Sequence, residues 1–272
     1  MKIRTLLVST LLISNSLWAA PAKKLDSYWQ PAAASENVIV DHSAWQKILD
    51  KYLSKNQQKQ TFFAYKSVNS QDAQLLKNYI QSLQNLNPLE LTRVQQKAYW
   101  INLYNAATVS LILDNLPVKS ITKLGSGLFA FGPWDDKLLT INNRKLTLND
   151  IEHRILRPIY NDARIHYAVN CASFSCPNLA DTAYTKSNTE ALLEQGAKEY
   201  VNHPRGVTVT SKGLTLSTIY DWYQSDFGAN EAGVVKHLQK YANPALAEKL
   251  TALASKKLNI KYDYNWDLNQ TK

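Results

Sequence analysis

The chain has 272 residues, of which 45% are hydrophobic and 19% are charged, and its formal net charge is +9. This length is enough for one large domain or two small ones with a sizeable core. A dense basic block would indicate nucleic-acid binding, but the basic residues are scattered, so we expect a solvated basic surface and no nucleic-acid partner. The scatter is visible at Lys51, Lys55, Lys59, Lys66 and Lys77.

The first 22 residues have the layout of a secretory signal peptide. Lys2 and Arg4 precede an uncharged apolar run at residues 6–18, and Ala-Pro-Ala at residues 20–22 offers small residues for cleavage. The run is shorter than the roughly 20 residues that a membrane span needs. We therefore expect a periplasmic or secreted protein without a transmembrane segment after signal removal. The signal peptide holds two basic residues and no acidic one, so its removal lowers the net charge from +9 to +7.

Residues 23–40 are rich in Ala, Pro and Ser and predict a flexible N-terminal arm. Residues 41–266 contain no stretch with linker composition, repeats or low complexity. Residues 41–272 are therefore predicted to form a single domain.

Three helices are predicted in the first half of this domain. Apolar residues recur at helical spacing in residues 45–53 and 75–83. The capping box Thr92-x-x-Gln95 opens a third helix that continues through residues 98–113. This third helix is apolar on nearly every face, so we expect it to be buried.

Two hairpins are predicted. Residues 137–148 contain Asn142-Asn143, a pair that tolerates the positive φ of a two-residue turn. Residues 207–217 form the second candidate, with Gly213 at the turn.

Between the hairpins, residues 151–158 predict a short helix that its terminal proline closes. Residues 164–171 predict a buried strand. In an extended strand, His166 and Asn170 share one face and Cys171 the other. His166 would then not lie beside the thiol.

The C-terminal part continues the mixture of helices and strands. Ser187-x-x-Glu190 caps a helix. Further helices are predicted at residues 216–223, 234–241 and 245–254, followed by a last strand at residues 257–266. The predicted fold class is α+β, with helices packed on a small, mainly antiparallel sheet.

Four segments resemble the domain of unknown function 547 family. They are AYWINLYNAATVSLIL (98–113), WDDKLLTINNRKLTLNDIEHRILRP (134–158), ARIHYAVNCASFSCPNL (163–179) and LSTIYDWYQSDF (216–227). Their order and spacing fit the family's pattern across residues 95–230, and the pair IEHxILRP and HxAxNCxxxSCP is specific. The resemblance implies a fold similar to papain-like thiol hydrolases.

The same resemblance implies a cleft in which a cysteine, a histidine and a polar or acidic partner meet. The catalytic candidates are Cys171 as nucleophile, His153 as general base and acid, and Glu152 or Asn170 to orient the imidazole. A thiol attacks as thiolate and needs a neighbour that lowers its pKa. Phe174 departs from the smaller or basic residue of the family pattern and could narrow the pocket.

Other readings of the two cysteines stay open. An exported chain with two cysteines can form a Cys171–Cys176 disulfide. A metal site would use His166, Cys171 and Cys176, with His153 as the fourth ligand, but the spacing fits no standard zinc motif, so we expect no metal and no cofactor.

The remaining candidates are binding residues. The asparagines of the apolar helix, Asn102 and Asn105, either line a cleft or bond to neighbouring backbone. His166 is a third candidate. Phe131 and Trp134 lie in a glycine- and aromatic-rich loop that could form a lid over a cleft, and the loop lacks the pattern of a phosphate-binding loop.

Two functions follow. The first is a thiol-dependent hydrolase or transferase acting on an amide, a peptide or a small thiol-containing substrate. The alternative is a non-catalytic periplasmic binding module, locked by the disulfide, for a small-molecule or peptide ligand.

Overall fold

The computed structural model describes residues 20–127, 131–211, 213–254 and 259–271. Most of the predicted signal peptide, residues 1–22, therefore lies outside the described residues. Within the described ranges, no helix is long and apolar enough to cross a membrane. Helices dominate and the strands form small sheets, so the predicted α+β class is confirmed.

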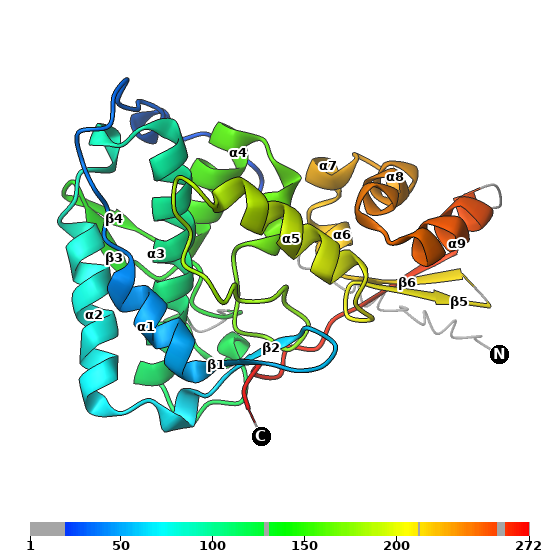
Figure 1. Ribbon diagram of the computed structural model, residues 1–272, viewed down its shortest axis with the longest axis horizontal. Helices are drawn as coiled ribbons and strands as arrows, with labels where there is room; N and C mark the ends of the chain where they lie inside the picture. The colour runs from blue at the N-terminus through cyan, green and yellow to red at the C-terminus, as the bar shows by residue number, and fades with distance from the viewer. Residues whose placement is uncertain (1–19, 128–130, 212, 255–258, 272) are drawn as a thin grey trace, which may run out of the picture.

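The larger hydrophobic core surrounds the long helix α3 (Arg93–Asp114) (Figure 1). The predicted capping box is present, because Thr92 and Gln95 each bond the other's backbone or side chain. Most residues of α3 are buried, as its apolar pattern predicts. The elements around it are η1 (Ser27–Trp29), α1 (Ser43–Tyr52), β1 (Leu53–Lys55), β2 (Thr61–Phe63), η2 (Tyr65–Ser67), α2 (Ser70–Gln84), η3 (Pro88–Glu90), η4 (Ile121–Lys123), β3 (Leu139–Ile141) and β4 (Arg144–Leu146).

A second core adjoins the first and belongs to the smaller, C-terminal part of the molecule (Figure 1). Helix α5 packs against both α3 and α8 and so joins the two parts. The elements of this part are α5 (Thr189–Val201), β5 (Val207–Thr210), β6 (Gly213–Ser217), α6 (Ile219–Trp222), α7 (Gln224–Phe227), α8 (Glu231–Tyr241), α9 (Pro244–Ala254) and β7 (Ile260–Asp263).

Both predicted hairpins are confirmed. β3 pairs antiparallel with β4, and Asn142 and Asn143 have φ of 48° and 59° at the turn. β5 pairs antiparallel with β6 and turns before Gly213, whose φ is 140°. A Cβ on Gly213 would lie 2.1 Å from the carbonyl oxygen of Asn259, so the close approach of β7 also requires glycine here.

The last predicted strand is confirmed in its central part as β7, which pairs parallel with β6 and completes a three-stranded sheet. The helix predicted at residues 216–223 is wrong at its start, because Leu216 and Ser217 belong to β6. Only Ile219–Trp222 is helical there. Residues 216–219 are apolar or small and fit a helix or a strand equally well. The pairing of Leu216 and Ser217 with β7 decides for the strand.

Two predictions around the cysteine motif are wrong. The helix predicted at residues 151–158 does not end at Pro158. A π-helical segment, η5 (Asp150–Leu156), continues directly into α4 (Arg157–Tyr160), where the proline occupies the first turn and needs no N–H partner. The strand predicted at residues 164–171 is wrong, because the 3₁₀ helix η6 (Ala163–Tyr167) and then irregular chain occupy these positions.

The side chain of Asp162 explains this second difference. It accepts a hydrogen bond from the backbone N–H of Arg164 at 3.0 Å and so starts a turn at the point where the strand was expected. The predicted alternation of His166 and Cys171 on opposite strand faces therefore does not occur.

Candidate functional site

A cavity of about 580 Å³ lies between η5, the segment after η6 and the segment after β7. It brings together six predicted site residues and the second cysteine of the motif. These lining residues are Phe131, Trp134, Glu152, His153, His166, Cys171 and Cys176. The predicted residues Asn102, Asn105 and Asn170 are buried and are not among the lining residues of the cavity.

Asn170 shapes the loop that carries the thiol. Its Oδ1 accepts the N–H of Ala172 at 2.8 Å, and its Nδ2 donates to the carbonyl of Pro177 at 2.7 Å. Its own N–H donates to Oδ1 of Asn105 on α3, whose Nδ2 donates to the carbonyl of Ala168. The two side chains therefore attach the loop to the central helix.

The loop also needs an unusual backbone conformation. Ala172, directly after the nucleophile candidate, has a φ of 60°, in the left-handed region that alanine rarely adopts. The hydrogen bond from its N–H to Asn170 and the one that its carbonyl accepts from the N–H of Asn269 stabilise this turn. The turn leaves the side chain of Cys171 at the cavity wall.

Asn102 has an equivalent role one turn earlier on α3. Its Oδ1 accepts the N–H of Tyr184 at 3.0 Å, and its Nδ2 donates to the carbonyl of the same residue at 2.7 Å. This bidentate contact anchors the chain that follows the cysteine loop.

The predicted Cys171–Cys176 disulfide is wrong, because both cysteines are free thiols. Their sulfur atoms are 2.9 Å apart, whereas a disulfide bond is about 2.05 Å long. The backbone N–H of Cys171 donates to Sγ of Cys176 at 3.0 Å. The two sulfur atoms therefore meet through hydrogen bonds.

Two hydroxyl groups complete the surroundings of the Cys171 thiol. Its Sγ lies 3.0 Å from Oγ of Ser173 and 3.1 Å from Oη of Tyr264, and these two oxygens are 2.7 Å apart. We call Cys171, Ser173, Cys176 and Tyr264 the thiol side of the cavity.

The surroundings on the thiol side shift the pKa values of the two cysteines in opposite directions. Burial alone would raise the pKa of Cys171, but hydrogen bonds from Cys176, Ser173 and Tyr264 outweigh it and lower this pKa to about 7. Burial and the neighbouring Cys171 raise the pKa of Cys176 well above its ordinary value. Burial likewise raises the pKa of Tyr264, which remains a phenol. Cys171 is therefore the cysteine that ionises more readily, and Cys176, Ser173 and Tyr264 are the hydrogen-bond donors to its thiolate.

The segment after β7 holds Tyr264 in place. Phe174 donates its N–H to the carbonyl of Asp267 at 2.7 Å, and Ser175 donates to the carbonyl of Asn265 at 3.1 Å. The C-terminal segment thus runs beside the cysteine loop. Sequence analysis missed Tyr264 and Ser173, because a tyrosine 93 residues from the thiol carries no local signal of this contact.

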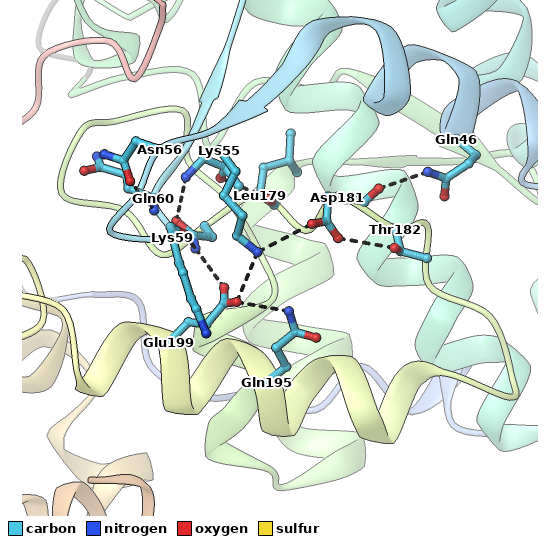
Figure 2. Close-up of polar contacts among 12 residues, drawn as sticks. Gln46, Lys55, Asn56, Lys59, Gln60, Leu179, Asp181, Thr182, Gln195 and Glu199 are labelled. Atoms are coloured by element: carbon cyan, nitrogen blue, oxygen red, sulfur yellow. Dashed lines mark hydrogen bonds and ion pairs between the residues drawn. The ribbon is translucent and has the colours of Figure 1, made fainter. Parts of the chain in front are cut away.

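Polar contacts also hold the chain that follows the cysteine loop, as Figure 2 shows. Lys55 of β1 reaches both Asp181 and Glu199, with Nζ–O distances of 3.5 and 3.1 Å. Gln46 of α1 donates to the carbonyl of Asp181 at 2.9 Å. Helices α1 and α5 and the β1–β2 hairpin therefore restrain the chain after Cys176.

A buried guanidinium adds to this restraint. Arg205 donates through Nη1 to the carbonyls of Phe174 and Cys176, at 3.1 and 2.6 Å, and through Nη2 to Oδ1 of Asn178. Its position just before β5 ties the cysteine loop to the second core.

The opposite side of the cavity is charged, and we call Glu152, His153, Arg157, His166 and Asp226 the charged side. Arg157 is 4% exposed and donates through Nε to Oδ2 of Asp226 at 2.6 Å. Nε2 of His166 lies 2.9 Å from the same oxygen, and its Nδ1 lies 3.4 Å from Oε1 of Glu152. His166 therefore bridges two carboxylates.

His153 has its tautomer set by Arg157. Nη1 of Arg157 lies 3.1 Å from Nδ1 of His153, and a guanidinium can only donate. Nδ1 must therefore accept, so the neutral ring carries its proton on Nε2. Burial lowers the pKa of His153 to about 4 despite the attraction of Glu152, so the ring is a neutral N–H donor at pH 7.

Glu152 is ionised although it is buried. Burial alone would raise its pKa, but His153, His166 and Arg157 together lower it to about 2. Tyr104 of α3 donates its hydroxyl to Oε2 at 3.3 Å. The carboxylate is thus fixed by positive charge and by a hydrogen bond.

The π-helical form of η5 has consequences for the backbone. The wider turn leaves the carbonyls of His153 and Arg154 to accept the N–H groups of Lys24 and Asp26, each at 3.0 Å. Nη1 of Arg157 also donates to the carbonyl of Pro21 at 2.8 Å. Residues 20–26 therefore run along the charged side, and Ala20 and Pro21 line the cavity.

Five aromatic rings form what we call the aromatic wall, namely Phe131, Trp134, Trp222, Tyr264 and Trp266. The ring of Trp266 contacts the other four at centroid distances of 4.5 to 5.7 Å. The two aromatic residues predicted from the glycine-rich loop therefore belong to a surface that also uses α6 and the C-terminal segment. In the described part of the chain, no cluster of His, Cys, Asp and Glu has the arrangement of a metal site.

Residues 88–201 match the model of a family described as "Protein of unknown function, DUF547". The matched range contains Cys171, His153 and Glu152, whereas Tyr264 and Trp266 lie outside it. Comparison with the curated proteins gives no significant match, and comparison with the solved structures gives none either.

Proposed function

We propose thiol-dependent acyl transfer with Cys171 as the nucleophile, from the chemistry of the cavity, because the family whose model matches residues 88–201 is itself described as of unknown function. The protein would act as a hydrolase or transferase on an amide, a peptide or a small thiol-containing substrate. One observation carries this proposal. The thiol whose pKa is lowered to about 7 lies at the wall of a cavity large enough for a small molecule.

The thiolate would attack the carbonyl carbon of the substrate and form a C–S bond, while the carbonyl electrons move to the oxygen. The C–N or C–S bond to the leaving group then breaks, and the leaving group takes up the proton that the thiol had released to solvent. Water, or a second nucleophile, attacks the resulting thioester and restores the thiol.

The proposed roles of the other residues follow from their protonation. His153 carries a proton on Nε2, so we assign it a hydrogen bond to the developing oxyanion in place of the general-base role expected from the sequence. Burial keeps the imidazole neutral, and the hydrogen bond from Arg157 fixes its tautomer. Asn170 positions the thiol loop. The leader-like residues 1–22 support a periplasmic or secreted location for this activity.

Alkylation tests the nucleophile. The rate of reaction with iodoacetamide, followed by intact mass from pH 5 to pH 10, is expected to give one fast site with a midpoint near pH 7. Peptide mapping should locate it at Cys171, and Cys171→Ala should abolish it. A midpoint at the ordinary thiol value of about 8.5 would contradict the proposal.

Acylation tests the reaction class. Incubation with p-nitrophenyl acetate is expected to add one acetyl group to Cys171 and to release p-nitrophenol with a burst. Cys171→Ala serves as the control that removes the nucleophile and should show no acetylation and no burst. A protein that binds small molecules in the cavity but never acquires the acetyl group would be a non-catalytic binding module.

A further inference from the structure

The cavity lining is unusual for a chain with a formal net charge of +9. Three lining residues carry carboxylates, namely Asp135, Asp136 and Glu152, and none of the described lining residues is a lysine or an arginine. A basic protein would be expected to place at least as many cations there. Arg157 and the two histidines offset the charge of Glu152, so Asp135 and Asp136 are the carboxylates that favour a ligand of positive charge.

The carboxylates of Asp135 and Asp136, which we call the acidic rim, are held by neutral groups. Oδ1 of Asp136 accepts hydrogen bonds from the hydroxyl and the N–H of Ser126, at 2.5 and 3.3 Å. Oδ1 of Asp135 accepts from Nδ2 of Asn149 at 2.8 Å. Within the described residues, neither carboxylate has a lysine or arginine nitrogen within ion-pair distance. Their negative charge is positioned but not neutralised.

The aromatic wall includes Trp134, the residue directly before these aspartates. Trp134 is followed by Asp135 and Asp136, and its ring lies 5.7 Å from Trp266. Aromatic faces beside carboxylates bind organic cations, because the ring quadrupole and the negative charge attract the same group. The acidic rim and the aromatic wall thus both favour an organic cation.

A polar atom deeper in the cavity is also without a hydrogen bond. His166 is 3% exposed and lines the cavity, and its Nδ1 makes no hydrogen bond within the described residues. Oε1 of Glu152 lies 3.4 Å from it. The carboxylate of Glu152 therefore already faces this edge of His166, and the cation is assigned to Asp135 and Asp136 instead.

We propose that the cavity binds a substrate that carries an organic ammonium group, with the cation against the aromatic wall and beside Asp135 and Asp136. This inference rests on the proposed function, since it names the substrate class of the same site. The acyl carbon would then lie toward Cys171, and the cation would select which acyl compounds reach the thiol.

The test compares two probes of nearly equal shape, choline and its neutral isostere 3,3-dimethyl-1-butanol. Both are titrated by calorimetry into full-length Cys171→Ala protein, with wild type as the reference for folding. We expect choline to bind about tenfold more tightly, within the range of cation–π and ionic contributions.

The variant Asp135→Asn/Asp136→Asn should reduce this preference to about twofold or less. Asp50→Asn/Asp263→Asn is the matched control, because it removes the same charge from exposed residues that do not line the cavity. Equal affinity for the two probes, or an equal loss in the control, would overturn the inference.

The two proposals fail separately. If Cys171 alkylates near pH 7 but the two probes bind alike, the ammonium inference is wrong and the thiol chemistry stands. If choline is preferred but the thiol is inert, the cavity is an ammonium-binding site without acyl transfer.

Discussion

The thiol side and the charged side of the cavity both bury titratable groups, but they stabilise them by different means. Around Cys171 the partners are neutral donors, a thiol and two hydroxyls, which hold the pKa near 7. On the charged side, Arg157 pairs with Asp226, and His166 lies between Glu152 and Asp226. His153 adds to the electrostatic surroundings of Glu152. The thiol side is therefore poised to change its charge near neutral pH, whereas the charged side is locked in one state.

This difference indicates a division of labour. A nucleophile must gain and lose charge during the reaction, and neutral donors allow both states. A group that presents a fixed N–H donor to an oxyanion must keep its protonation, and a compensated ionic cluster ensures that. The predictions below test each half of this comparison.

The largest effect is expected from Arg157→Met. The substitution leaves Asp226 and Glu152 without their buried cation, and breaking a buried pair typically destabilises by about 3–5 kcal/mol. Urea denaturation measures the loss. Arg154→Met is the control, because that side chain is 44% exposed and pairs with Asp150 and Asp26 at the surface. The free energy of unfolding that Arg154→Met loses should stay below about 1 kcal/mol. Equal losses in the two variants would show that the buried ion pairs of Arg157 do not stabilise the charged side.

The next effect is a dependence of stability on pH. The pKa of His153 falls from 6.5 to about 4 on folding, so the unfolded chain binds more protons between these values. Stability is therefore lost as the pH falls from about 6.5 to about 4, by up to about 3 kcal/mol for this group. Glu152, whose pKa is lowered to about 2, adds a further loss below its ordinary value of 4.5.

His153→Gln isolates the histidine contribution. Urea midpoints at pH 7 and pH 4.5 should differ less in this variant than in the wild type. An unchanged difference would show that other groups, such as the buried His42, dominate the acid response.

A smaller effect is expected from Tyr264→Phe on the thiol side. Removing a donor to the thiolate raises the pKa of Cys171 toward the ordinary thiol value of about 8.5. The pH profile of alkylation measures it. Tyr262→Phe is the matched control from the same segment, since Tyr262 does not line the cavity. If the midpoint of the pH profile stays at about 7 in Tyr264→Phe, this hydroxyl does not lower the pKa of Cys171.

The smallest effect concerns the turn after the nucleophile. Ala172→Gly removes a Cβ from a residue at φ 60°, which relieves roughly 1 kcal/mol of strain and adds a similar entropic cost. We expect a net change within about 0.5 kcal/mol and an unaltered alkylation rate. Ala168→Gly, at φ −105°, is the control that should only destabilise.

Local sequence patterns were sufficient for the elements whose structure depends on near neighbours. The capping box at Thr92, the Asn142-Asn143 turn and the apolar face of α3 each involve residues a few positions apart, and all three are confirmed. The family motifs also identified Cys171, His153 and Glu152, which the fold brings to one cavity.

Tertiary structure decided the rest. Residues 164–171 have the composition of a strand, but a strand needs a partner, and the turn started by Asp162 prevails. The surroundings of the free thiol of Cys171 have the same kind of cause, since one of the two hydroxyl groups that contact its Sγ comes from Tyr264, beyond β7. The pKa of a buried group depends on the charges and donors that folding places around it, and the linear sequence does not contain those distances.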